Sequence, residues 1–256
     1  MSAQDFFLPL HNADGIIAFT TTRGGESPDD PYGRFSLCHY TGDTAGHVAT
    51  CRRALADRLS ISPERLIVPR QTHSSNVAII TGDMPLPTLL EETDAVVTDV
   101  PQLAIGVNTA DCVPLLLFDP AARVIAAVHA GWRGTVARIA AKAVAATSSL
   151  GATPRHIRVI IGPCICPDCF EVGYEVVEQF AEAGFPVADI ASRHPGTGKQ
   201  HIDLREANHI VLVDSGILAE NIAPAVGCSR CNPDRYFSAR RLGIASGRTF
   251  TGVMME

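Results

Sequence analysis

The chain has 256 residues, enough for one large domain or two small ones, and its 46% hydrophobic and 19% charged residues are typical of a globular protein. A formal net charge of −6 argues against a general affinity for nucleic acid or an anionic membrane surface. No apolar run reaches the roughly 18–20 residues of a membrane helix, and no secretory signal begins the sequence. We therefore expect a cytoplasmic protein whose eight cysteines are thiols or metal ligands rather than disulfides.

Seven short segments have the composition of β-strands. Each is rich in Val, Ile or Leu and is bounded by turn-forming residues. Several follow one another after only a few residues, which favours antiparallel or mixed pairing over a strictly parallel sheet. The predicted strands are GIIAF (15–19), VAII (77–80), DAVVTD (94–99), LAIGV (103–107), VPLLLF (113–118), VIAAVHA (124–130) and RVIIG (158–162).

Four helices are predicted from apolar side chains that recur at helical spacing. The last of them has Asp203 as a good N-cap, with Glu206 three residues later, and is expected to carry Ile217. The polar segment HPGTGKQ (194–200) predicts an exposed loop. The helices are expected to begin at Thr44, after Gly134, at about Gly173 and near Asp203.

No internal repeat divides the chain, and no linker rich in Pro, Gly or Ser interrupts it. We therefore expect residues 1–256 to form a single α/β (α+β) domain, in which mixed β-sheets pack against helices.

Three segments place a His or a Cys at a strand end or in a loop, where ligand and catalytic residues concentrate. QTHSSNV (71–77), NTADCVPLLL (108–117) and VHAGWRGT (128–135) contain His73, Cys112 and His129 respectively. These residues lie 39 and 17 positions apart, unlike the compact spacing of a zinc finger. The spacing therefore leaves three interpretations open: metal ligands, a Cys nucleophile with a His base, or ordinary structural side chains.

The same segments resemble signatures of the YfiH-like family, also called the laccase-domain or polyphenol-oxidase-like family. This sequence departs from the family pattern at Ser74, where Gly is usual, at Asn232, where Thr is usual, and at Ser36, where Asn is usual. These departures concern the shape of the pocket and leave His73, Cys112 and His129 intact. Further resemblances, in the family's order, are TTRGGES (21–27) with Pro31 and Tyr32, IGPCI (161–165), FEVG (170–173), HIDLREAN (201–208), Cys231, YFSARR (236–241) and GR (247–248).

The resemblance implies a zinc-dependent purine nucleoside enzyme. The family's zinc ion is held by two His and one Cys, which correspond here to His73, His129 and Cys112, and the same residues are the expected catalytic set; copper is the alternative metal. Three protein ligands leave a fourth position open, as in catalytic zinc sites, where the pKa of water falls to about 7. The implied reactions are deamination of adenosine to inosine, and phosphorolysis of adenosine, inosine, guanosine and methylthioadenosine to the base and (methylthio)ribose 1-phosphate.

Phosphorolysis also requires a site for phosphate, the implied co-substrate. GWRGT (131–135) is a glycine-flanked turn between a strand and a helix, and it predicts an anion site made of backbone N–H groups and Arg133. Arg23 is the second candidate for binding phosphate or ribose. Asp111, next to Cys112, is expected to cap a turn or orient the backbone rather than to react.

The cysteines form a second pattern that the resemblance does not explain. Cys164, Cys166 and Cys169 make a C-x-C-x-x-C run, and Cys228 with Cys231 makes a C-x-x-C pair. Such a pattern is typical of a second zinc site or an iron–sulfur site. The family resemblance involves only Cys164 and Cys231, so the favoured expectation is that the others are incidental thiols.

Other functions stay open at this point. Cys112 and His129 also fit a cysteine hydrolase (amidase), with Cys112 attacking an amide and His129 as base. The family resemblance suggests the editing of peptidoglycan precursors as the role of such a hydrolase. A copper-dependent polyphenol oxidase is the third enzyme class, although only one His/His/Cys set is evident; a metal-sensing or protein-binding module is the non-enzymatic alternative. The expected partners are small-molecule nucleosides and phosphate, not nucleic acid or membrane, and the oligomeric state is left open.

Overall fold

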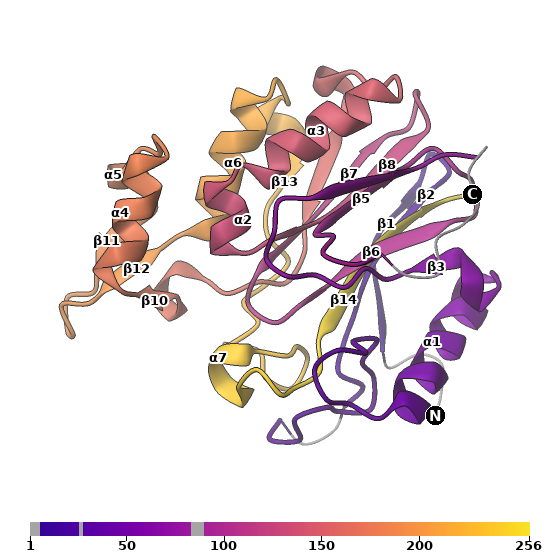
Figure 1. The fold of residues 1–256 in the computed structure, drawn as a ribbon, viewed down its shortest axis with the longest axis horizontal. Helices are drawn as coiled ribbons and strands as arrows, with labels where there is room; N and C mark the ends of the chain where they lie inside the picture. The colour runs from indigo at the N-terminus through magenta and orange to yellow at the C-terminus, as the bar shows by residue number, and fades with distance from the viewer. Residues whose placement is uncertain (1–5, 26–27, 83–89) are drawn as a thin grey trace.

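The computed structural model describes residues 6–25, 28–82 and 90–256, and the strands of these ranges form three sheets (Figure 1). Glu26 and Ser27 of the TTRGGES segment lie outside the described residues. The first sheet has the order β1-β2-β14-β6-β3, in which only β3 and β6 are parallel. Its strands are β1 (Phe7–Ala13), β2 (Ile16–Thr21), β3 (Leu66–Ile67), β6 (Ala104–Thr109) and β14 (Thr249–Met255).

The second sheet has six strands in the order β13-β9-β7-β8-β5-β4, and it mixes parallel outer pairs with antiparallel inner ones. The third is small, with the order β10-β12-β11. The bounds are β4 (Val77–Ile80), β5 (Ala95–Thr98), β7 (Val113–Asp119), β8 (Val124–Ala130), β9 (Arg158–Ile161), β13 (Ile222–Ala223), β10 (Glu171–Val172), β11 (Ala191–Arg193) and β12 (Gln200–Ile202).

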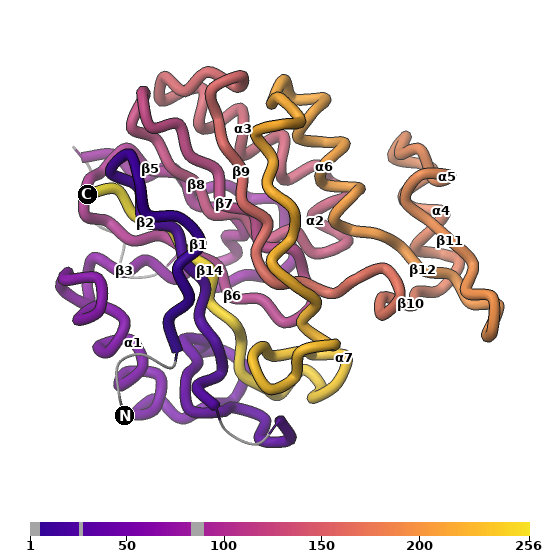
Figure 2. Tube along the Cα trace, turned by 180° about the vertical axis from the view of Figure 1, so that it is seen from behind, coloured from indigo at the N-terminus to yellow at the C-terminus, as the bar shows by residue number. Residues whose placement is uncertain are grey.

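The two larger sheets pack face to face, with helices on both outer sides. Along β8, Val124, Ala126 and Val128 belong to the cluster that packs against helices, whereas Ile125 and Ala127 pack toward the other sheet. Because side chains alternate along a strand, a strand covered on both faces is apolar over most of its length, as β8 is from residue 124 to residue 128. Figure 1 shows α3 and α6 on one outer side and α1 on the other, while Figure 2 shows β14, at the chain's C-terminal end, beside the N-terminal strands.

The predicted helices are present, with two differences. The helix expected after Gly134 is two helices, because Arg138 adopts a left-handed φ of 56° between them. The helix capped by Asp203 ends at Asp214, so Ile217 lies beyond it. The bounds are α1 (Ala45–Leu59), α2 (Trp132–Val136), α3 (Ile139–Ser149), α4 (Tyr174–Glu182), α5 (Val187–Ile190), α6 (Leu204–Asp214) and α7 (Ala239–Leu242), with 3-10 turns at Pro63–Arg65, Pro154–His156, Pro167–Cys169 and Ala219–Asn221.

The predicted fold class is confirmed: the chain is a mixed α/β protein. All seven predicted strands are present, and pairing is mixed, as the short connections indicated. The segment 194–200, predicted as a loop, connects β11 to β12 in an antiparallel hairpin and gives its last residue to β12. Within the described residues, no helix is both long enough and apolar enough to cross a membrane.

Candidate active site

The structure brings His73, Cys112 and His129 together at one end of the six-stranded sheet. Cys112 immediately precedes β7, and His129 lies near the end of β8, where Val113 pairs with Ala130 in the antiparallel ladder. His73 comes from the loop before β4. One donor atom from each residue lies within 4.8 Å of the other two, and the Cys112 Sγ to His73 Nε2 distance is 3.8 Å. His129 is buried, Cys112 is half-buried and His73 is exposed, so the cluster opens to solvent on the His73 side.

Asp94, a fully buried residue, holds the two histidines in place. Its Oδ1 lies 2.7 Å from His129 Nδ1 and accepts the backbone N–H of His73 at 3.1 Å. Its Oδ2 accepts the backbone N–H and the hydroxyl of Ser74 at 2.8 and 2.6 Å, and the backbone N–H of Thr72 at 3.2 Å. Because an ionised carboxylate only accepts, Nδ1 of His129 carries a proton, and Nε2 is the nitrogen that a metal ion would bind.

The ionised state of Asp94 follows from these contacts. Burial by itself raises the pKa of Asp94, but hydrogen bonding and charge from His129, with the Ser74 hydroxyl, outweigh it and hold the pKa below the usual value. The same carboxylate offsets backbone strain, since His73 has a left-handed φ of 60°, which non-glycine residues rarely adopt. Asp94 was not among the residues predicted from the sequence. The only local signal was an acidic residue at the head of the apolar strand segment 94–99.

Gly131 lets the backbone approach the cluster closely. A Cβ at this position would lie 2.9 Å from His73 Cδ2 and 3.1 Å from Cys112 Sγ. Its φ is −69°, so the requirement is for space and not for an unusual backbone conformation. Gly131 is also the N-cap of α2, which therefore begins against the candidate ligands.

The electrostatics of the cluster favour a thiolate. Burial by itself raises the pKa of Cys112, but the charge and hydrogen bonding of His129 and His73 lower it to about 6. Burial likewise lowers the pKa of His129, yet Cys112 and Asp94 raise it to about 9. At neutral pH the metal-free cluster is therefore a thiolate beside an imidazolium, and a metal ion would displace one proton from His129.

Asp111 connects the Cys112 loop to two distant segments. Its carboxylate accepts the Ser229 hydroxyl at 2.7 Å and the Arg240 backbone N–H at 2.7 Å, and its carbonyl accepts the Ile165 N–H at 2.9 Å. Its φ is 87°. Asp111 thus orients the backbone beside Cys112, as the sequence analysis expected.

The two predicted anion-binding arginines differ in their surroundings. Arg133 is exposed on α2, and its guanidinium carbon lies 4.2 Å from the Trp132 ring centroid. Arg23 is fully buried, and its guanidinium donates to the carbonyl oxygens of Pro28, Asp30 and Pro233. The Arg23 guanidinium is thus enclosed and engaged with backbone carbonyls, which favours a structural role, and its role in binding phosphate or ribose stays a prediction.

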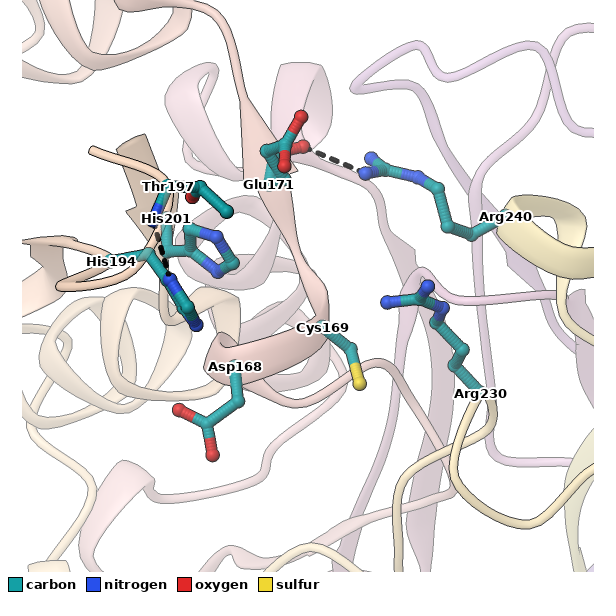
Figure 3. A pocket seen from close by; sticks show the side chains of 8 residues that line it. All are labelled: Asp168, Cys169, Glu171, His194, Thr197, His201, Arg230 and Arg240. Atoms are coloured by element: carbon teal, nitrogen blue, oxygen red, sulfur yellow. Dashed lines mark hydrogen bonds between the residues drawn. The ribbon is translucent and has the colours of Figure 1, made fainter. Parts of the chain in front are cut away.

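A pocket of about 300 Å³ lies along the small sheet (Figure 3). Figure 3 shows the guanidinium groups of Arg230 and Arg240 on one side, facing His194 and His201 on the other. Arg240 donates to the Glu171 carbonyl at 2.9 Å, and its own backbone N–H is the one that Asp111 accepts. The pocket is therefore attached to the loop that carries Cys112. Its remaining lining residues are Asp168, Cys169, Glu171 and Thr197.

Fold and site together define an α/β protein with an open His/Cys/His cluster, supported by a buried carboxylate. The chain matches the family described as multi-copper polyphenol oxidoreductase laccase over residues 16–256, and it belongs to that family. The resemblance inferred from the sequence motifs is therefore confirmed.

Relatives and solved structures agree with this membership. The chain is 49% identical to adenosine deaminase RL5 from an unknown prokaryotic organism, over 94% of this chain and 95% of that protein. It is 39% identical to a purine nucleoside phosphorylase of Bacteroides thetaiotaomicron, over 96% and 94% of the two chains. Its fold is similar to Bacillus licheniformis YfiH, with a TM-score of 0.90 and 28% identity over 98% and 97%, and to Geobacillus stearothermophilus YlmD, with a TM-score of 0.88 and 29% identity over 99% and 97%.

Proposed function

We propose that this chain is a zinc-dependent purine nucleoside enzyme. It catalyses the phosphorolysis of adenosine, inosine, guanosine and methylthioadenosine, and the deamination of adenosine. The observation that carries the proposal is the convergence of His73, Cys112 and His129, with donor atoms within 4.8 Å of one another and one side open to solvent. The names of the relatives, an adenosine deaminase and a purine nucleoside phosphorylase, support the substrate class.

The residues present fit a zinc ion. One thiolate and two imidazoles are ligands that zinc prefers, and three of them leave the fourth tetrahedral position for substrate or water. A zinc ion at such a site supplies Lewis-acid activation near neutral pH. His73, Cys112 and His129 would hold it, and Asp94 keeps His129 in the tautomer whose Nε2 can bind. We favour zinc over copper because the proposed reactions involve no change of oxidation state.

Phosphate, the proposed co-substrate, is assigned to Arg133 because α2 begins against the cluster. A charge-assisted contact contributes on the order of 1.5–3 kcal/mol. Arg133→Ala should therefore raise the KM for phosphate about tenfold or more and change the KM for nucleoside far less. If the phosphate dependence is unchanged, the anion sits elsewhere, and the pocket lined by Arg230 and Arg240 is the next location to test.

A second candidate function is favoured by one observation. The spatial arrangement also fits a nucleophile, Cys112, beside a base, His129, which is oriented by the Asp94 carboxylate. His129 Nδ1 lies 2.7 Å from Asp94 Oδ1. The lowered pKa of Cys112 suits a nucleophile as well as a metal ligand. A cysteine amidase acting on peptidoglycan precursors would use this arrangement without a metal.

One assay separates the two mechanisms. In the zinc enzyme, chelation abolishes nucleoside turnover, added zinc restores it, and the metal-loaded protein resists brief iodoacetamide treatment at Cys112. In the hydrolase, chelation leaves activity intact, alkylation of Cys112 is fast, and an acyl adduct on Cys112 appears by mass spectrometry with an amide substrate. Observing that adduct would overturn the zinc proposal. Cys51→Ala serves as the control, because Cys51 lies on α1, packed in the cluster around that helix.

A multi-copper oxidase, the chemistry in the family's description, is less well supported. Such an oxidase needs several copper ions, and copper prefers imidazole-rich ligand sets. Over residues 6–25, 28–82 and 90–256, the only other group of at least three His, Cys, Asp or Glu donors able to hold a metal consists of four cysteines. We further propose that residues 1–256 form one domain of this family and that the protein acts in the cytoplasm on small molecules.

A further inference from the structure

Four cysteines from two distant segments gather on the surface beside the small sheet. Cys166 and Cys169 form one C-x-x-C pair, and Cys228 and Cys231 form the other. All four sulfur atoms lie within 4.8 Å of one another, and those of Cys169 and Cys231 are 3.5 Å apart. A tetrahedral zinc ion with Zn–S bonds of about 2.3 Å places its sulfur ligands about 3.8 Å apart. The four thiols therefore already stand near the spacing that one metal ion requires.

The backbone, and not chance side-chain contact, sets this arrangement. Cys164 and Cys228 form a parallel β-bridge, with Cys164 N–H donating to Gly227 at 3.1 Å and Ser229 N–H donating to Cys164 at 3.0 Å. Each C-x-x-C pair then turns back on itself, one through the 3-10 turn Pro167–Cys169. The backbone N–H of Cys166 donates to Cys228 Sγ at 3.3 Å, a contact that stabilises a thiolate.

Cys164, the fifth cysteine of the region, is excluded from the group. It is fully buried among apolar residues of the main core, and its sulfur is not part of the four-cysteine set. The other four cysteines differ in exposure: Cys228 is buried, Cys166 and Cys169 are half-buried, and Cys231 is exposed. Solvent therefore reaches the group on the side of Cys231. Figure 3 shows the Cys169 sulfur at the pocket, with Arg230 on the neighbouring wall.

We propose that Cys166, Cys169, Cys228 and Cys231 bind a second zinc ion, which fastens the two loops together. On binding, the four thiols lose four protons to solvent as four Zn–S bonds form, with no change of oxidation state. The centre then carries a net charge of −2, beside the guanidinium of Arg230 within the second loop. A complete set of four thiolate ligands leaves no open position, so this site is structural and not catalytic.

The position of the second site links it to the first. The Cys164 loop donates to the Asp111 carbonyl through Ile165, and the Cys228 loop donates to its carboxylate through Ser229. Asp111 in turn immediately precedes Cys112. A zinc ion joining the two loops therefore stabilises the backbone that presents Cys112, without contacting any substrate.

Metal content of purified protein variants tests the proposal directly. The wild type, purified under reducing conditions, should hold two zinc ions per chain by elemental analysis, and Cys51→Ala should also hold two. Cys231→Ser and Cys112→Ala should each hold one, and the double variant none. Cys231 is exposed, so its replacement is the least disruptive of the four. Because Cys112→Ala removes only the first site, failure of the proposed nucleoside chemistry and failure of the second site are distinguishable.

Two further measurements define the site. Cobalt substituted into Cys112→Ala should show the intense thiolate-to-metal absorption of a four-thiolate site, and Cys231→Ser should show the weaker band of a single thiolate. Chelation should lower the melting temperature of Cys112→Ala but not that of Cys112→Ala/Cys231→Ser. The proposal is overturned by a wild type that holds one zinc while these four thiols react freely with a thiol reagent. Bound iron, or a Cys169–Cys231 disulfide in the reduced preparation, would overturn it as well.

Discussion

Replacing Asp94 with Asn removes one negative charge and turns one of two acceptor atoms into a donor. The two carboxylate oxygens face different groups: Oδ2 meets Thr72 and Ser74, and Oδ1 meets His73 and His129. The amide oxygen of Asn is expected to take the Oδ2 position, where three donors converge. Its NH2 group then faces His129 Nδ1, which must become an acceptor, so the imidazole proton moves to Nε2. For Nε2 to bind a metal ion, this proton would have to return to Nδ1, where it would face the NH2 donor of the Asn side chain.

Asp94→Asn should lower both the free energy of unfolding and the affinity for zinc. The variant loses the charge-assisted hydrogen bond from the His73 N–H, which contributes about 1.5–3 kcal/mol, and replaces the one from His129 with a neutral bond of about 1 kcal/mol. The free energy of unfolding of the metal-free protein should therefore fall by about 2–5 kcal/mol. A lost partner of a ligating histidine typically lowers metal affinity by about 10–100-fold. We expect the zinc affinity of Asp94→Asn to be about 10–100-fold lower than that of the wild type, with a matching loss of kcat/KM at limiting zinc.

Chelator competition measures the zinc affinity, and urea unfolding of the metal-free protein measures stability. Asp119→Asn is the matched control, because Asp119 is 2% exposed and its carboxylate accepts three backbone N–H groups but no histidine. It should lose about 1.5–3 kcal/mol of stability and keep the wild-type zinc affinity at the His/Cys/His site. Wild-type zinc affinity in Asp94→Asn would refute the tautomer argument.

Three more variants test separate parts of the structure. Gly131→Ala puts a methyl group against the His/Cys/His cluster, so zinc affinity and kcat should fall about 100-fold with little change in melting temperature. Unchanged kinetics would show that the side chains of the cluster can move aside and still bind and react normally. Gly106→Ala places a Cβ 2.3 Å from Phe250 Cζ, and urea unfolding should show a loss of about 1–3 kcal/mol with normal zinc binding. Burial lowers the pKa of His47, but hydrogen bonds to a carbonyl and to Asp43 outweigh it and raise the pKa overall. Protonated His47 therefore stabilises the fold below pH of about 6.5, and this stabilisation is lost as pH rises through the raised pKa. The difference in free energy of unfolding between the wild type and His47→Gln should therefore become smaller with increasing pH.

The sheet core was predictable because burial on two faces leaves a local signature. Strands such as β7 and β8 pack against helices on one face and against the second sheet on the other, so their sequences are apolar over residues 113–118 and 124–128. β1 and β14 leave no such signature. β14 contains Thr249, Thr251 and Gly252, and its place between β2 and β6 depends on pairing with segments at least 140 residues away in sequence. Pairing of that kind is a tertiary property that no local window contains.

Position at or near predicted strands singled out His73, Cys112 and His129, and the family resemblance implied their role as metal ligands, which stays a prediction. Asp94, which supports them, could not be identified from the sequence, because it lies about 20 residues from the loop whose N–H groups it accepts. The burial of Arg23 was also not predictable, because nothing in the TTRGG segment indicates that the folded chain encloses this side chain. The Arg23 guanidinium donates to the carbonyl oxygens of Pro28 and Pro233, and these two residues lie on segments far apart in the sequence.

The two cysteine-containing sites are joined through Asp111, and this connection bears on how the enzyme is built. Cys112 follows a residue with a left-handed φ of 87°, which is costly unless surrounding contacts hold it. Those contacts come from the loops of Cys164 and Cys228 and from the Arg240 backbone. The bridge between the two loops contains only a few hydrogen bonds, so the proposed metal ion across their cysteines would add a further constraint there. In this arrangement, the proposed four-cysteine zinc site stabilises the backbone beside Cys112, so that the His/Cys/His site keeps its geometry during substrate binding and product release.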